Sequence, residues 1–131
     1  MSLAPLLAAP LVVVLHTLAA VAALVFGAAQ LLGPKGAATH RMLGWLWVGL
    51  MAATAISSLW ISRAPVVAGF GWIHLLSILS LAMLPLAVSA ARRGRRREHA
   101  TRMRWLYFAA LVAAGAFTLA PGRIMHAVAF G

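Results

Sequence analysis

Hydrophobic residues in this chain run in long uninterrupted stretches, without the strict alternation of a half-buried strand. Four of these stretches are about as long as a helix that crosses a bilayer, which needs roughly 20 residues. They cover residues 11–32, 42–62, 66–91 and 105–121. The pattern therefore predicts an all-α protein with one integral membrane domain over residues 1–131, built as a four-transmembrane-helix bundle.

Helix-breaking residues separate the stretches. Gly33 and Pro34 follow the first, Pro65 follows the second, and Pro121 ends the fourth. The third and fourth are joined by a short predicted loop, residues 92–104, that holds seven of the eleven basic residues. Because apolar spans flank this loop on both sides, we interpret it as a membrane-surface segment that attracts anionic lipids, and we predict no nucleic-acid partner.

The composition excludes most familiar kinds of site. The chain is 64% hydrophobic and 9% charged over 131 residues, which is too apolar for a surface in water. Glu98 is its one acidic residue, and it has no cysteine. Carboxylate pairs, thiolate nucleophiles and iron–sulfur clusters are therefore excluded, and a zinc or copper site is disfavoured. Five histidines remain as candidates for chemistry.

The basic residues also predict an orientation. Nine lie in the loops after the first and third helices, whereas only Arg63 and Arg123 lie elsewhere. Loops rich in lysine and arginine stay in the cytoplasm. We therefore expect a multi-pass protein of the bacterial inner membrane, with both of these loops cytoplasmic and both termini on the outer side.

Four histidines fall into two pairs with nearly equal spacing. His16 and His74 are 58 positions apart, and His40 and His99 are 59 apart. The two members of each pair lie at corresponding positions in two helical hairpins. Either a duplication or coincidence would produce this pattern. Because the first and third helices enter from the same side, His16 and His74 are expected at one depth near the outer face. His40 and His99 are expected at the cytoplasmic boundary.

Small and polar residues recur at helical spacing on the first two helices, and we expect both stripes to face the bundle axis, since small residues let helices approach and polar ones avoid lipid. The two stripes are His16, Ala20, Ala23, Gly27 and Gln30, and then His40, Gly44, Trp47, Met51, Thr54 and Ser58.

Paired imidazoles from separate helices can supply both axial ligands of a b haem. The leading hypothesis is a membrane electron-transfer protein that binds one or two b haems, through His16 with His74 and through His40 with His99. Six arginines are candidate contacts for lipid headgroups or haem propionates: Arg92, Arg93, Arg95, Arg96, Arg97 and Arg123. The alternative is a non-enzymatic accessory or assembly subunit, in which the histidines only hydrogen-bond between packed helices. For His126, beyond the last span, a surface role is expected.

Several short motifs carry a family resemblance. They are Pro34-Lys35-Gly36 with His40-Arg41, then Trp72-Ile73-His74, Ala90-Ala91-Arg92-Arg93-Gly94 and Pro121-Gly122-Arg123. The chain resembles the bacterial membrane proteins grouped as domain of unknown function 2306, a resemblance that implies four helices and an inner-membrane location without an activity. One departure is Ala100-Thr101-Arg102-Met103, where such proteins carry basic residues directly after the histidine. The paired-histidine plan is also similar to small dihaem b-type cytochromes, which implies a quinone or a redox protein as partner.

Overall fold

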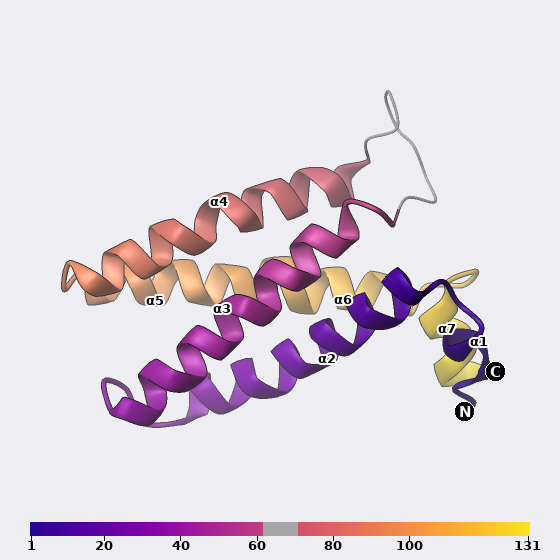
Figure 1. Ribbon diagram of the computed structural model, residues 1–131, viewed down its shortest axis with the longest axis horizontal. Coiled ribbons are helices and arrows are strands. Elements are labelled where there is room, and N and C mark those ends of the chain that lie inside the picture. The colour runs from indigo at the N-terminus through magenta and orange to yellow at the C-terminus, as the bar shows by residue number, and fades with distance from the viewer. Residues whose placement is uncertain (62–70) are drawn as a thin grey trace.

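The computed structural model describes residues 1–61 and 71–131, and residues 62–70 lie outside the description. Four long helical rods lie side by side in Figure 1, and every regular element of the described residues is helical, which confirms the all-α prediction. The elements are α1 (Ala4–Leu7), α2 (Leu11–Leu32), α3 (Ala38–Ser58), α4 (Trp72–Arg92), α5 (Arg96–Trp105), the π-helical η1 (Leu106–Val112), α6 (Ala113–Phe117) and α7 (Ile124–Phe130).

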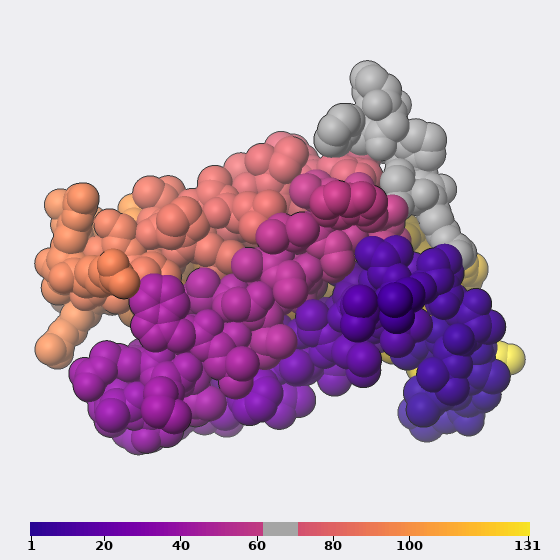
Figure 2. All heavy atoms as spheres, in the orientation of Figure 1, coloured from indigo at the N-terminus to yellow at the C-terminus, as the bar shows by residue number. Residues whose placement is uncertain are grey.

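α3 lies at the centre of the face shown in Figures 1 and 2, where it packs against α2 on one side and α4 on the other. The continuous rod of α5, η1 and α6 lies behind it, with α5 and η1 against α4 and η1 also against α2. The loop after α2 and the turn between α4 and α5 lie at one end of the molecule. The short helices α1 and α7 lie together at the other end, where the Ser2 amide donates to the Val128 carbonyl at 3.1 Å.

The helix bounds differ from those predicted, except that α2 covers the range expected for the first span. The second helix starts at Ala38 instead of residue 42 and ends at Ser58. Residue 66, the predicted start of the third helix, lies outside the described residues. The turn predicted at Pro65 and residue 62, the predicted end of the second helix, also lie outside them. Gly71 is extended and α4 begins only at Trp72. The last rod begins at Arg96, nine residues before the predicted 105. Hydropathy marks where a helix enters lipid, whereas a helix can extend beyond it.

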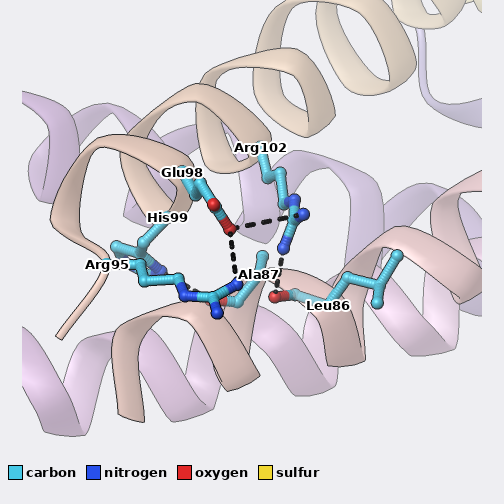
Figure 3. A network of polar contacts seen from close by, with 6 residues as sticks. All are labelled: Leu86, Ala87, Arg95, Glu98, His99 and Arg102. Carbon is cyan, nitrogen blue, oxygen red and sulfur yellow. Dashed lines mark hydrogen bonds and ion pairs between the residues drawn. The ribbon is translucent and has the colours of Figure 1, made fainter. Parts of the chain in front are cut away.

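The basic segment is therefore a tight turn and a helix, and the loop predicted over residues 92–104 is wrong. Gly94 has a φ of 72°, and its amide donates to Ala91 O at 3.1 Å while the Arg95 amide donates to Ala90 O at 2.9 Å. This pair of bonds is the Schellman ending of a helix, in which glycine takes the left-handed position. Glu98 then pairs with Arg95 and Arg102 at helical spacing, 3.6 and 3.5 Å away (Figure 3).

Small and polar residues share the interior with a few large apolar ones, whereas many large apolar residues face outward. Among the described residues the buried set includes Ala23, Gly27, Ala55, Ala87, Ala90, Ser58, Ser77 and Ser80. Along α2 the exposed large apolar residues are Leu11, Leu15, Leu18, Val21, Val25 and Leu32. In a soluble protein large apolar side chains of this kind are most often buried. Close helix approach with leucine outside fits a lipid surrounding, where small residues build the helix contacts. By length and hydropathy, α2 and α4 of the described helices qualify as membrane spans.

Gly27 of α2 lies in close contact with side chains of α3 and η1. A methyl group added to it would lie 2.6 Å from Trp47 Nε1 and 2.5 Å from Tyr107 Cε2. Both rings are held in place, because Trp47 Nε1 donates to Ala23 O at 2.9 Å and the Tyr107 hydroxyl donates to Leu24 O at 3.0 Å. The small stripe of α2 therefore faces the interior, as predicted, and lets α3 and η1 approach.

Candidate functional site

His40 and His99 meet at the end of the molecule that carries the basic residues. Their ring centres are 6.5 Å apart and their planes are inclined at 78°. His40 lies in the first turn of α3 and His99 in the first half of α5, so the two rings come from separate helices. The structure thus brings together one of the two histidine pairs that the sequence predicts.

A backbone carbonyl fixes the orientation of His99. Its Nδ1 lies 2.9 Å from Ala87 O, and a carbonyl can only accept, so Nδ1 carries the proton of the neutral ring. The Nε2 atom then keeps its lone pair, as in metal-ligating histidines whose other nitrogen is bonded to a carbonyl. Arg102 Nη1 donates to the neighbouring Leu86 O at 2.8 Å, and Figure 3 shows both bonds joining α5 to α4.

His40 has an unused nitrogen. Its Nδ1 is buried and has no hydrogen-bond partner. Within residues 1–61 and 71–131, no other buried side-chain nitrogen or oxygen lacks one. Gln30 Nε2 donates to the His40 carbonyl at 2.8 Å and so ties this turn to α2. A metal would need a lone pair on such a ring nitrogen, and the neutral form of an imidazole provides one.

His16 bonds to the C-terminal part of α3. Its Nδ1 lies 3.0 Å from Thr54 O and 2.9 Å from Ser57 Oγ. Ser57 Oγ in turn donates to Ala53 O at 2.7 Å, so both atoms near His16 act as acceptors for the Nδ1 proton. This is the helix-to-helix hydrogen bonding that the alternative to haem ligation expects.

His74 uses both ring nitrogens at the start of α4. The Gly71 amide donates to Nδ1 at 3.1 Å, so the proton of the neutral ring lies on Nε2, which is 3.3 Å from Leu59 O. The first bond satisfies an amide at the helix start, as the third helical residue does in a capping box. His16 and His74 therefore each bond to the end of α3, and His74 has no lone pair left for a metal without giving up the Gly71 amide.

Several cations near the histidine pair already have partners. Lys35 Nζ donates to Leu31 O in the last turn of α2 at 2.9 Å and to Gly33 O, just after the helix, at 2.7 Å. The Arg92 guanidinium lies over the Trp45 ring, 5.4 Å from its centre. At the opposite end Arg123 is exposed at the start of α7.

Three contacts at these ends were not predicted from the sequence. His126 Nδ1 bonds to Leu119 O at 2.7 Å, so His126 holds α7 to the end of the last rod. The capping role of His74 was missed, although the glycine three positions before it is a sequence signal for it. The Arg92–Trp45 contact joins α4 to α3 and follows no local pattern.

A comparison with protein families assigns the chain. The family described as predicted membrane protein (DUF2306) matches residues 13–130. The chain belongs to this family. The match confirms the resemblance carried by the sequence motifs and identifies a membrane protein in contact with the lipid bilayer. No curated protein and no solved structure matches the chain of this DUF2306 protein.

Proposed function

We propose that this DUF2306 protein is a membrane electron-transfer protein that binds one b haem between His40 and His99. The observation that carries the proposal is the approach of these two rings from separate helices, with a buried and unpartnered nitrogen on His40. Metal–imidazole bonds are about 2 Å long, so a metal held between two imidazoles separates their ring centres by about 6 Å. The observed 6.5 Å is close to this separation.

A haem suits this pair better than a bare metal ion. In the described part of the chain no group of three histidine, cysteine, aspartate or glutamate side chains could hold an ion. A porphyrin brings four nitrogen ligands of its own, so two imidazoles complete its coordination. When bound, the haem would supply a one-electron couple. The protein would hold it through His40 and His99, fix His99 through Ala87 O, and offset the propionates with nearby cations.

The proposed arrangement in the membrane has all four rods crossing the bilayer. Besides α2 and α4, which are long and apolar enough, α3 and the α5–η1–α6 rod have similar numbers of residues. Both lie alongside α2 and α4, inclined to them (Figure 1). The loop after α2 and the Gly94 turn share one end and carry most of the positive charge. By the positive-inside tendency this end is cytoplasmic in the inner membrane, and both termini lie outside.

Cysteine labelling tests this orientation, because the chain has no cysteine of its own. We expect Ser2→Cys in intact spheroplasts to react with a membrane-impermeant maleimide, and Arg97→Cys to react only after lysis. Both positions are exposed, so access alone decides the result. Reaction of Arg97→Cys in intact cells, with Ser2→Cys protected, would reverse the proposed topology.

The electron carrier proposed for this site is a quinone, because a haem held within a membrane bundle is within reach of lipid-soluble carriers. Protein purified from haem-replete cells is expected to show a Soret band and a b-type band on reduction. Addition of a short-chain quinol should produce the reduced band without dithionite. Protein that carries no haem after such growth, and binds none when haem is added, would end the cytochrome proposal.

The second candidate is a non-enzymatic accessory subunit of a membrane complex. It is favoured by His16 and His74, whose nitrogens bond to carbonyls of α3 and so contribute to packing. A colourless protein that co-purifies in fixed ratio with another membrane protein would support this function.

A further inference from the structure

We propose that the groove between α3 and α4 is a binding site for one anionic phospholipid, with the headgroup phosphate on Arg92 and Arg93 and one acyl chain along the groove. This proposal does not depend on haem binding. The groove has a volume of about 600 Å³ and its lining includes Trp45, Leu81, Pro85 and Val88. Volumes of about 300–1,000 Å³ are usual for small-molecule sites.

The two ends of the groove differ in the way that a lipid requires. Arg92 and Arg93 lie at one end, whereas the rest of the lining is almost wholly apolar. The α4 residues that line it extend from Leu81 to Arg93, which is about 18 Å of helix. Half of a hydrocarbon core is about 15 Å thick. One acyl chain of the adjacent leaflet therefore matches the groove in length, and Trp45 marks the headgroup level.

The positive charges of Arg92 and Arg93 have no acidic side chain of the protein as a partner. Glu98 is the only acidic side chain of the protein, and it pairs with Arg95 and Arg102. No carboxylate is left for Arg92 and Arg93. The contact of Arg92 with the Trp45 ring engages the charge of the guanidinium, and its N–H donors remain available for phosphate oxygens. A phosphodiester headgroup with a net negative charge supplies the missing partner.

Native mass spectrometry of the full-length protein tests the proposal, with dioleoylphosphatidylglycerol and dioleoylphosphatidylcholine as probes. We expect one phosphatidylglycerol to stay bound at activation that removes phosphatidylcholine. The double substitution Arg92→Gln with Arg93→Gln should reduce the bound fraction at least five-fold. The matched control, Arg96→Gln with Arg97→Gln, removes the same charge from exposed positions outside the groove and should change it less than two-fold.

A second substitution tests the apolar part without changing charge. Ala52 lines the groove, and Ala52→Phe should fill it and lower phosphatidylglycerol retention to a similar degree. Arg93→Gln alone keeps the Arg92–Trp45 contact and gives a readout if the double variant does not fold. Equal losses in the two arginine pairs would mean that charge acts diffusely. Three results would each overturn the proposal. They are equal losses in the two arginine pairs, normal lipid retention by Ala52→Phe, and equal binding of the two lipids.

Discussion

His40→Ala and His99→Ala are each expected to remove the whole Soret band of the purified protein. If one haem is held between these two rings, loss of either imidazole leaves a single axial ligand and breaks the b-type coordination. The measurement is the reduced-minus-oxidised spectrum per mole of protein, after growth in haem-replete medium.

The other two histidines provide the control for this experiment. His16→Ala and His74→Ala remove bonds to the end of α3 and should lower thermal stability while the spectrum per folded protein stays unchanged. If His16→Ala removed half of the absorbance and His40→Ala the other half, the single site would be wrong and the two-haem hypothesis from the sequence would hold.

Gly27→Ala is expected to destabilise the helix bundle by about 2 kcal/mol or more, as overpacking of a closely packed interior does. The added methyl group would lie within 2.6 Å of ring atoms of Trp47 and Tyr107, and each of these rings is held by a hydrogen bond to a carbonyl of α2. Neither ring can move away without losing that bond. The measurement is the midpoint of thermal unfolding in detergent, followed by circular dichroism.

Gly49→Ala is the matched control in α3. A methyl group there meets no atom within 4 Å, and alanine favours a helix over glycine by roughly 1 kcal/mol. Its unfolding midpoint should therefore stay the same or rise. If the two variants behaved alike, the close approach of Trp47 and Tyr107 to Gly27 would not hold in the folded protein.

The sequence predicted the bounds of a helix well where the apolar stretch and the helix end together. It predicted them poorly where the helix continues beyond the apolar stretch. α2 has the predicted bounds, because its apolar run ends at Gly33 and Pro34, which also end the helix. α5 was missed because seven of its ten residues are charged or polar, and only Ala100, Met103 and Trp105 are apolar. Hydropathy does not detect such a helix, although the spacing of Glu98 and Arg102 indicates one.

The candidate site could be predicted only in part. The order of the helices predicts that His40 and His99 lie at the same depth in the membrane. The structure brings these two rings together. The order of the helices could not indicate the hydrogen bonds of each ring, since the carbonyl near His99 belongs to Ala87 and the amide near His74 to Gly71. Those bonds decide which nitrogen keeps a lone pair, and they depend on the rotation of each helix about its axis.

The π-helical segment within the last rod makes that rod tolerant of a change in length. A π turn contains more residues than the 3.6 of an α turn. Removing one residue from Leu106–Val112 can therefore convert a wide turn to an ordinary one, while the flanking helices keep the sides they present to their neighbours. The same deletion in the middle of α2 would swivel half of that helix by about 100° and carry its small-residue stripe out to the lipid.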